Sequence, residues 1–163
     1  MTPLKIYIAR ETAIGTAINF VIGSAFFLMI FRGQTELQVW GPRGLILDCV
    51  PQGFMIGLMS IIPAMLITRR RVDRGLSFGP APAALGLLPR GVFKRGLVVA
   101  LSTMASLVAA AAALAWVTGV DTVPFWPAFA LKALPGLLAP WVIIPPAILV
   151  ALSNSPQSPS IPA

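Results

Sequence analysis

The sequence of 163 residues contains no histidine, a single cysteine (Cys49) and only five acidic residues. Without histidine the chain lacks the usual haem ligand, the most frequent general base and a main ligand of zinc and iron. With one cysteine it cannot form a disulfide within the chain. No nucleophile stands beside a base in any recognisable pattern. We therefore expect a protein that is not an enzyme and that carries neither a metal nor an organic cofactor.

Charged residues are also scarce, at 10% of the chain against about 25% in soluble proteins, whereas 57% of the residues are hydrophobic. The net charge is +7, which in a soluble protein would suggest nucleic-acid binding. Here the basic residues lie between apolar runs, where they determine the orientation of a membrane protein. The expected partner is therefore the lipid bilayer, and no nucleic-acid partner is expected.

Four apolar runs are each long enough to cross a bilayer, which takes about 20 helical residues. They cover residues 12–31, 47–68, 97–118 and 135–152. The first run exceeds the length of a signal-peptide core and is followed by no convincing small-x-small cleavage site, so it is predicted to be retained. Residues 153–163, rich in Ser and Pro, are predicted to be disordered. The fold class is thus all-α, an integral membrane four-helix bundle.

The 12 basic residues predict the orientation of this bundle. With four spans, both termini and the loop between the second and third spans share one side. Three basic residues face the other side: Arg32, Arg43 and Lys132. The remaining nine are Lys5, Arg10, Arg69, Arg70, Arg71, Arg74, Arg90, Lys94 and Arg95. Because positive residues stay on the cytoplasmic side, both termini are predicted to be cytoplasmic.

Seven of these basic residues cluster at the two ends of the central loop. Basic residues next to a membrane attract anionic headgroups by about 1 kcal/mol each. The orienting role alone would also explain the cluster. The residues predicted to contact anionic lipid are Arg69, Arg70, Arg71, Arg74, Arg90, Lys94 and Arg95.

The sequence also suggests that the chain consists of two related helical hairpins. Asp48-x-x-Pro51 and Lys132-x-x-Pro135 are separated by 132 − 48 = 84 residues, and several other prolines and basic residues align at about the same offset. Such parallel repeats are related by an axis along the membrane normal. Prolines are frequent in this chain, so a chance match is the alternative.

Asp48 has three interpretations, because a carboxylate among apolar residues is costly unless it is paired or hydrated. In the first turn of the second span it would be stabilised by the helix dipole, which is the interpretation we favour. It could instead form an ion pair with Lys132, or carry protons or ions. Lys132 is predicted to lie on a short interfacial helix before Pro135, with its ammonium extending to the headgroups.

Small residues mark two predicted helix-packing stripes. Gly15, Asn19 and Gly23 share one face of the first span, and Gly53 and Gly57 share one face of the second. Glycines let helix backbones approach closely, and an amide can hydrogen-bond between helices. Two such stripes on consecutive spans predict that the first two helices pack together as a hairpin.

The second half of the chain resembles a known group of proteins. The pattern consists of Leu88, Pro89, Arg90, Phe125, Trp126, Phe129, Lys132, Pro135, Trp141 and Pro145. Over residues 88–152 it is similar to small two-helix bacterial inner-membrane proteins of unknown function. The resemblance implies a multi-pass protein of the bacterial inner membrane, and it brings no catalytic residues, because that family has none established.

These observations predict a non-catalytic accessory or scaffolding protein that acts with a membrane-protein partner or as a homo-oligomer. The alternative is a small proton-coupled transporter or exporter that works as an oligomer. Small four-helix multidrug exporters depend on a carboxylate buried in the first helix. In this chain the first span offers only Asn19 at that depth, with Glu11 at its edge.

Overall fold

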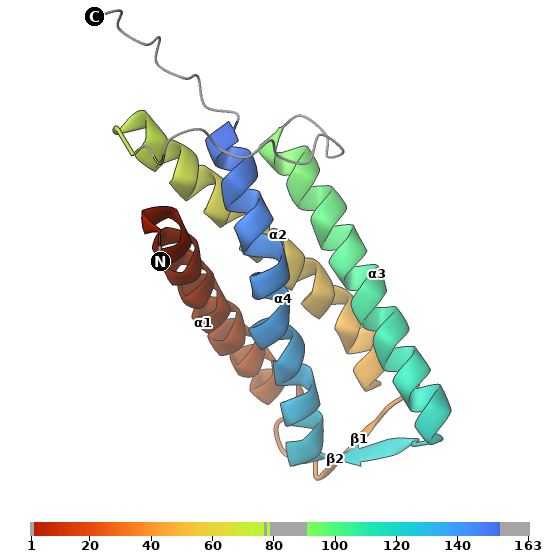
Figure 1. The fold of residues 1–163 in the computed structure, drawn as a ribbon. Coiled ribbons are helices and arrows are strands. Elements are labelled where there is room, and N and C mark those ends of the chain that lie inside the picture. Colours follow the sequence, from red (N-terminus) through yellow and green to blue (C-terminus); the bar gives the residue numbers. More distant parts are fainter. Residues whose placement is uncertain (1, 77, 79–90, 154–163) are drawn as a thin grey trace, which may run out of the picture.

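The computed structural model describes residues 2–76, 78 and 91–153. Four helices make up most of it (Figure 1): α1 (Pro3–Phe31), α2 (Leu45–Asp73), α3 (Val92–Thr118) and α4 (Phe125–Ser153). The short strand β1 (Glu36–Gln38) follows α1, and β2 (Thr122–Pro124) precedes α4; the two strands pair antiparallel. Ser153, the first residue of the predicted disordered tail, belongs to α4 instead. The rest of that tail, residues 154–163, and Arg90 lie outside the described residues.

Each helix is long and apolar enough to cross a membrane, and each contains one of the predicted spans. The chain is therefore a multi-pass membrane protein built from helices. Figure 1 shows the start of α1 and the end of α4 at the same end of the molecule, opposite the two strands. An even number of spans requires this arrangement.

The fourth helix begins ten residues before the predicted span. It runs without interruption from Phe125 through Pro135, so the predicted short interfacial helix around Lys132 is wrong. A proline removes one hydrogen bond of the helix and loosens the turn before it. In the turn before Pro135 a neighbouring helix adds a hydrogen bond, because the Gln52 amide nitrogen donates to the Lys132 carbonyl at 2.6 Å. Side chains of neighbouring helices help membrane helices to tolerate proline.

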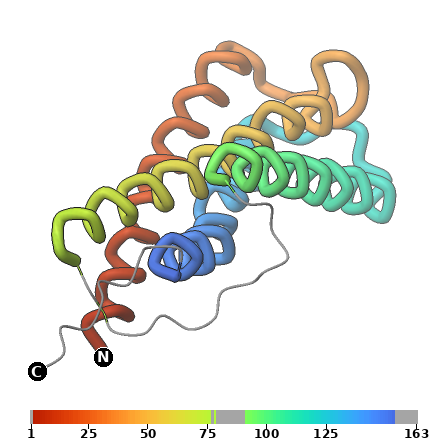
Figure 2. Tube along the Cα trace, turned by 90° about the horizontal axis from the view of Figure 1, so that it is seen from above, coloured from red at the N-terminus to blue at the C-terminus, as the bar shows by residue number. Residues whose placement is uncertain are grey.

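The helices form an open row in the order α1, α4, α2, α3 rather than a closed ring. α1 packs on α4, α4 on α2, and α2 on α3, whereas the two helices of each hairpin touch each other far less. Figure 2 shows α1 and α3 on opposite sides of the α2 and α4 pair. The prediction that α1 and α2 form a tightly packed hairpin is therefore wrong. The pairing of β1 with β2 joins the two hairpins at one end.

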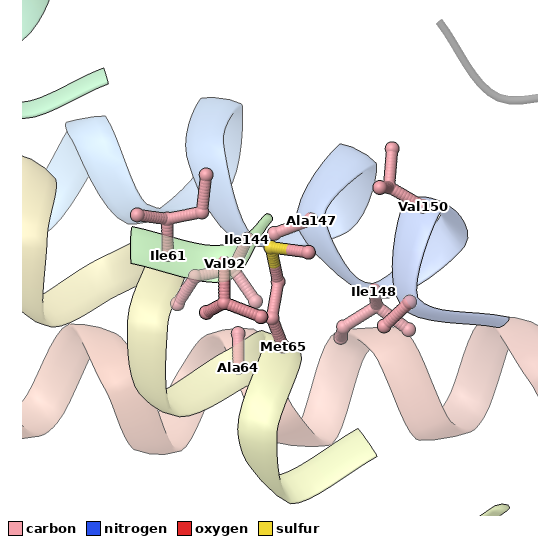
Figure 3. Packing of buried hydrophobic residues seen from close by; sticks show 9 residues of the cluster. Ile61, Ala64, Met65, Val92, Ile144, Ala147, Ile148 and Val150 are labelled. Carbon is pink, nitrogen blue, oxygen red and sulfur yellow. The ribbon is translucent and has the colours of Figure 1, made fainter. Parts of the chain in front are cut away.

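Two apolar clusters hold this row together. Near the end with the termini, Met65 is fully buried among residues of α4 such as Ile144 and Ile148, with Val92 of α3 also in the cluster (Figure 3). At the strand end, Leu37 is fully buried with Phe27 of α1 and other apolar residues of α2 and α4. The core thus lies at both ends of the central helix pair.

The glycine stripe of α2 packs closely, but against α3. A β-carbon on Gly53 would lie 2.7 Å from the Cα of Met104, and one on Gly57 would lie 2.6 Å from the Cα of Ala100. Backbone atoms cannot give way at such distances, so larger residues would force the two helices apart. Close packing at Gly53 and Gly57 agrees with the prediction, although the partner is α3 rather than α1.

The glycine stripe of α1 is only partly a packing surface. A β-carbon on Gly15 would meet the side chain of Ile144 on α4, whereas one on Gly23 would find no atom within 4 Å. The prediction that Gly23 is a close-packing position is therefore wrong. The absence of a side chain there leaves open space instead.

Candidate functional site

An ion pair connects α2 and α4 near the strand end of the bundle. The Lys132 ammonium lies 2.6 Å from the Asp48 carboxylate, with side-chain exposures of 9% and 18%. The ammonium also donates to the Leu45 carbonyl at 3.4 Å and to the Cys49 sulfur at 3.5 Å. Of the sequence-based interpretations, the independent snorkelling lysine is wrong. Asp48 does lie in the first turn of α2, as predicted, and it also has a basic partner.

Gln52 extends this polar cluster by one helical turn. Its position four residues after Asp48 places both side chains on the same face of α2. Its amide nitrogen bonds the Lys132 carbonyl, while its amide oxygen is buried and has no hydrogen-bond partner among the described residues. In the sequence Gln52 only borders the packing stripe of Gly53 and Gly57, and the sequence analysis gave it no role. The four-residue spacing from Asp48 was the signal that could have identified it.

Asn19 forms a second polar contact between helices. Its amide nitrogen donates to the Gly15 carbonyl of its own helix at 2.9 Å and to the Ser60 hydroxyl of α2 at 3.3 Å. Both Asn19 and Ser60 are buried. The predicted role of Asn19, a hydrogen bond to a neighbouring helix, is confirmed.

These polar groups border a cavity between α1 and α2. Its volume is about 220 Å³, and its lining combines Asn19, Asp48, Gln52 and Lys132 with apolar side chains of both helices. Gly23 also lines it, and the missing side chain there helps to keep it open. The cavity therefore brings two amides and an ion pair together in apolar surroundings.

The ion pair lies about one span length from the end of the bundle that holds the termini. Asp48 precedes Arg69 by 69 − 48 = 21 residues, and Lys132 precedes Ser153, the last residue of α4, by 153 − 132 = 21. At 1.5 Å per residue this is about 30 Å, the thickness of the hydrocarbon core. Asp48 and Lys132 thus lie about one span length from Arg69 and Ser153, at the end of the helices that holds the strands.

A second ion pair lies at the opposite end, where the termini are. The Arg71 guanidinium lies 2.6 Å from the Glu11 carboxylate and above the ring of Tyr7. The Tyr7 hydroxyl is 3.1 Å from the Thr68 hydroxyl. Arg71 therefore joins α2 to α1, which is a role that the sequence analysis did not predict for it.

The residues predicted to contact anionic lipid differ in their exposure in the structure. Arg70, Arg74 and Lys94 are exposed, as such contacts require. Arg95 is only 6% exposed and borders a cavity of about 160 Å³ between α2, α3 and α4. The prediction that Arg95 faces the lipid headgroups is therefore wrong.

Comparison with known proteins assigns neither a family nor a function to the chain. No protein-family model matches the chain, and neither the curated proteins nor the solved structures contain a match. Within the described part of the chain, no three His, Cys, Asp or Glu side chains come together to hold a metal ion. Any function has to be argued from the ion pairs, the cavities and the exposed faces of the helices.

Proposed function

We propose that this protein is a non-catalytic accessory or scaffolding subunit of a membrane assembly. The observation that carries the proposal is the pairing of the helix carboxylates. Asp48 and Glu11 each have a basic partner at 2.6 Å. The other three acidic residues, Glu36, Asp73 and Asp121, are exposed. A proton-coupled carrier needs an acidic group that can exchange its proton during transport. Carboxylates held in ion pairs between helices are better suited to fixing the arrangement of the row.

The open row also supports a role in assembly. α3 contacts mainly α2, so most of its surface is exposed, with Trp116 at 83% and Val117 at 84%. α1 occupies the opposite end of the row and is likewise largely exposed. Two membrane helices with free faces can each contact another protein or a second copy without any change in the central pair.

The proposal is tested by extracting the tagged protein in a mild detergent and measuring the mass of the native complex. A scaffold is expected in a defined complex with other membrane proteins or with copies of itself. In the variant Asp48→Asn, the fraction of complex that is lost should equal the fraction of protein that no longer folds. A monomer that drives proton-dependent uptake in vesicles would overturn the proposal.

We further propose that both termini lie in the cytoplasm, in the inner membrane of a bacterium. The basic residues at the end with the termini support this orientation. A reporter fused after Ala163 should be active only in the cytoplasm, and one inserted at residues 34–38 only on the outside. The opposite pattern would show that the bundle is inverted.

The second candidate function is a small proton-coupled transporter or exporter acting as an oligomer. It is favoured by the cavity of about 220 Å³, where Asn19, Asp48, Gln52 and Lys132 converge. A substrate that displaced Lys132 from Asp48 would free the carboxylate to bind a proton. Transport into vesicles that disappears in both Asp48→Asn and a folded Lys132→Gln variant would favour this candidate over the scaffold.

We also propose that the two hairpins are repeats related by a two-fold axis between α2 and α4. The contact of Gly53 with Met104 joins α2 to α3, and shifting both residues by 84 positions gives Leu137 and Phe20. In the structure, the adjacent Gly136 lies against Phe20 and joins α4 to α1. Asp48 and Lys132 would then be equivalent positions, so the exchange Asp48→Lys with Lys132→Asp should retain most of the stability. An exchanged variant as unstable as either single reversal would argue against equivalence.

A further inference from the structure

The cavity of about 220 Å³ between α1 and α2 has polar and apolar side chains in its lining. Its polar groups follow α2 away from the strands. Asp48 comes first and Gln52 one turn later, and both contact Lys132 of α4. Asn19 of α1 comes last, because it bonds Ser60, which follows Asp48 by 60 − 48 = 12 residues. What a ligand can bond here depends on the hydrogen-bonding capacity that these groups still offer.

The Lys132 ammonium has no hydrogen left for a ligand. An ammonium group carries three hydrogens. Its three partners are the Asp48 carboxylate at 2.6 Å, the Leu45 carbonyl at 3.4 Å and the Cys49 sulfur at 3.5 Å. An anion that enters the cavity therefore finds no free cation.

The two amides that line the cavity also use most of their hydrogens within the protein. The Asn19 nitrogen donates to the Gly15 carbonyl and to the Ser60 hydroxyl, which are as many bonds as it has hydrogens. The Gln52 nitrogen donates one of its two hydrogens to the Lys132 carbonyl. Within the described part of the chain, the second Gln52 hydrogen is the one donor of these groups that stays open.

The remaining capacity is that of acceptors. A carboxylate accepts about four hydrogen bonds, and Asp48, at 18% exposure, has Lys132 as its partner. Both bonds of the Asn19 side chain use its nitrogen, so its oxygen accepts none from the described residues. The Gln52 oxygen likewise has no partner among them. A ligand that satisfies these groups has to supply an O–H or N–H donor.

The rest of the lining is apolar, with side chains such as Phe26 of α1 and Met55 of α2. An ion in such surroundings is costly unless it meets an opposite charge. Asp48 and Lys132 neutralise each other, so an ionic ligand has to break their pair first. A neutral ligand does not, and the cavity therefore favours a neutral donor on an apolar body.

The size of the cavity limits the ligand to a small molecule. A cavity of about 150 Å³ holds benzene, so about 220 Å³ has room for a ring with a hydroxyl and one more group. Along α2 the lining extends from Asp48 to Met59, and these 59 − 48 = 11 steps cover about 17 Å. A helix of that length and about 10 Å across occupies on the order of 1,300 Å³. Even with the part that opens to the surface, the space amounts to about 780 Å³, so a helix of a second copy does not fit.

We propose that the cavity between α1 and α2 binds a small neutral hydroxyl compound of the size of a substituted phenol. Its hydroxyl donates to the Asp48 carboxylate, because hydrogen bonds to a charged acceptor are the stronger ones. Its apolar body lies between Phe26 and Met55. The inference rests on the second candidate function only for the choice of this cavity, since binding does not require transport.

The test uses the purified full-length protein in detergent micelles, titrated with para-trifluoromethylphenol and followed by fluorine NMR. The wild type is expected to bind one molecule per chain. Gly23→Leu puts a side chain into the cavity, where a β-carbon meets no atom within 4 Å, and should weaken binding by about tenfold or more. Ala25→Leu is the matched control, because Ala25 is exposed on the same helix and does not line the cavity. It should bind like the wild type.

Three further probes test the chemistry on the wild type, independently of how the variants fold. The methyl ether of the same phenol keeps the ring but has no donor, and it should bind about tenfold more weakly. The corresponding benzoate and benzylammonium ions should bind more weakly as well, by about tenfold or more. Each affinity is compared with that of Gly23→Leu in the same micelles, so that partition into detergent cancels.

Equal affinities of the phenol and its ether, or unchanged binding in Gly23→Leu, would overturn the proposal, because the cavity would then hold only water or detergent. A benzylammonium that binds more tightly than the phenol would overturn it too, since the site would then take a cation in place of Lys132. Binding in micelles without transport into vesicles would support this inference and not the second candidate function. Transport without any preference for the phenol over its ether would do the reverse.

Discussion

Neutralising the Asp48–Lys132 pair should reveal a strong energetic coupling between α2 and α4. Asp48→Asn leaves the Lys132 ammonium largely buried without its counter-ion, and Lys132→Gln leaves a carboxylate without its cation. Removing one partner of a buried pair costs about 3–5 kcal/mol because the other charge stays uncompensated. We expect each single variant to lose about 3 kcal/mol of unfolding free energy.

The magnitude of the coupling follows from the geometry. Two unit charges separated by 2.6 Å attract each other by about 1.6 kcal/mol in bulk water and by about 6.4 kcal/mol at an effective dielectric constant of 20. The Asp48 side chain is 18% exposed, so water still reaches the pair. We therefore expect a coupling energy of about 2 kcal/mol, close to the value for bulk water.

The assay is a double-mutant cycle of Asp48→Asn and Lys132→Gln, with unfolding free energies measured in mixed micelles of increasing SDS content. The double variant should be more stable than the two single losses together predict, because it leaves no unpaired charge. Additivity within ~0.5 kcal/mol would refute the reasoning. It would show that the two groups are solvated independently. Asp48 would then only stabilise the first turn of its helix.

The Glu11–Arg71 pair is the matched control for this cycle. It has the same separation of 2.6 Å, but the Arg71 side chain is 40% exposed. Exposed pairs contribute about 0–1 kcal/mol. A coupling at Glu11–Arg71 as large as that at Asp48–Lys132 would show that distance, and not burial, determines the strength of these pairs.

Two other predictions concern helix packing, measured as unfolding free energy in the same micelles. Gly57→Leu should cost about 2 kcal/mol or more, because its side chain would meet the α3 backbone, whereas Gly23→Leu should change stability by less than ~0.5 kcal/mol, because the position faces open space. Equal losses at both positions would contradict this assignment of the two stripes. Asn19→Ala and Ser60→Ala should show a coupling of about 0.6 kcal/mol, the average for hydrogen bonds between membrane helices. Strict additivity of these two changes would mean that the hydrogen bond contributes nothing to stability.

The contacts of the basic residues show where inference from the sequence reached its limit. The sequence predicts a basic cluster at the end that holds the termini, and the exposed Arg70 and Lys94 fit a surface role. It does not predict that Arg71 bonds Glu11 or that Arg95 is buried. A position in the sequence indicates the depth of a charge in the membrane, but its partner depends on which helix lies alongside.

By itself the sequence determined the number of helices, their approximate spans and the shared end of the two termini. These properties follow from the length of each apolar run, and length is local information that one segment carries alone. Only the tertiary structure decided that α2 packs on α3 rather than on α1, and that Lys132 pairs with Asp48. The physical reason is the solvent. Lipid surrounds an apolar helix on every side, so the hydrophobic pattern does not mark the face that meets another helix. That choice depends on small residues and polar partners distant in sequence, which come together only in the folded chain.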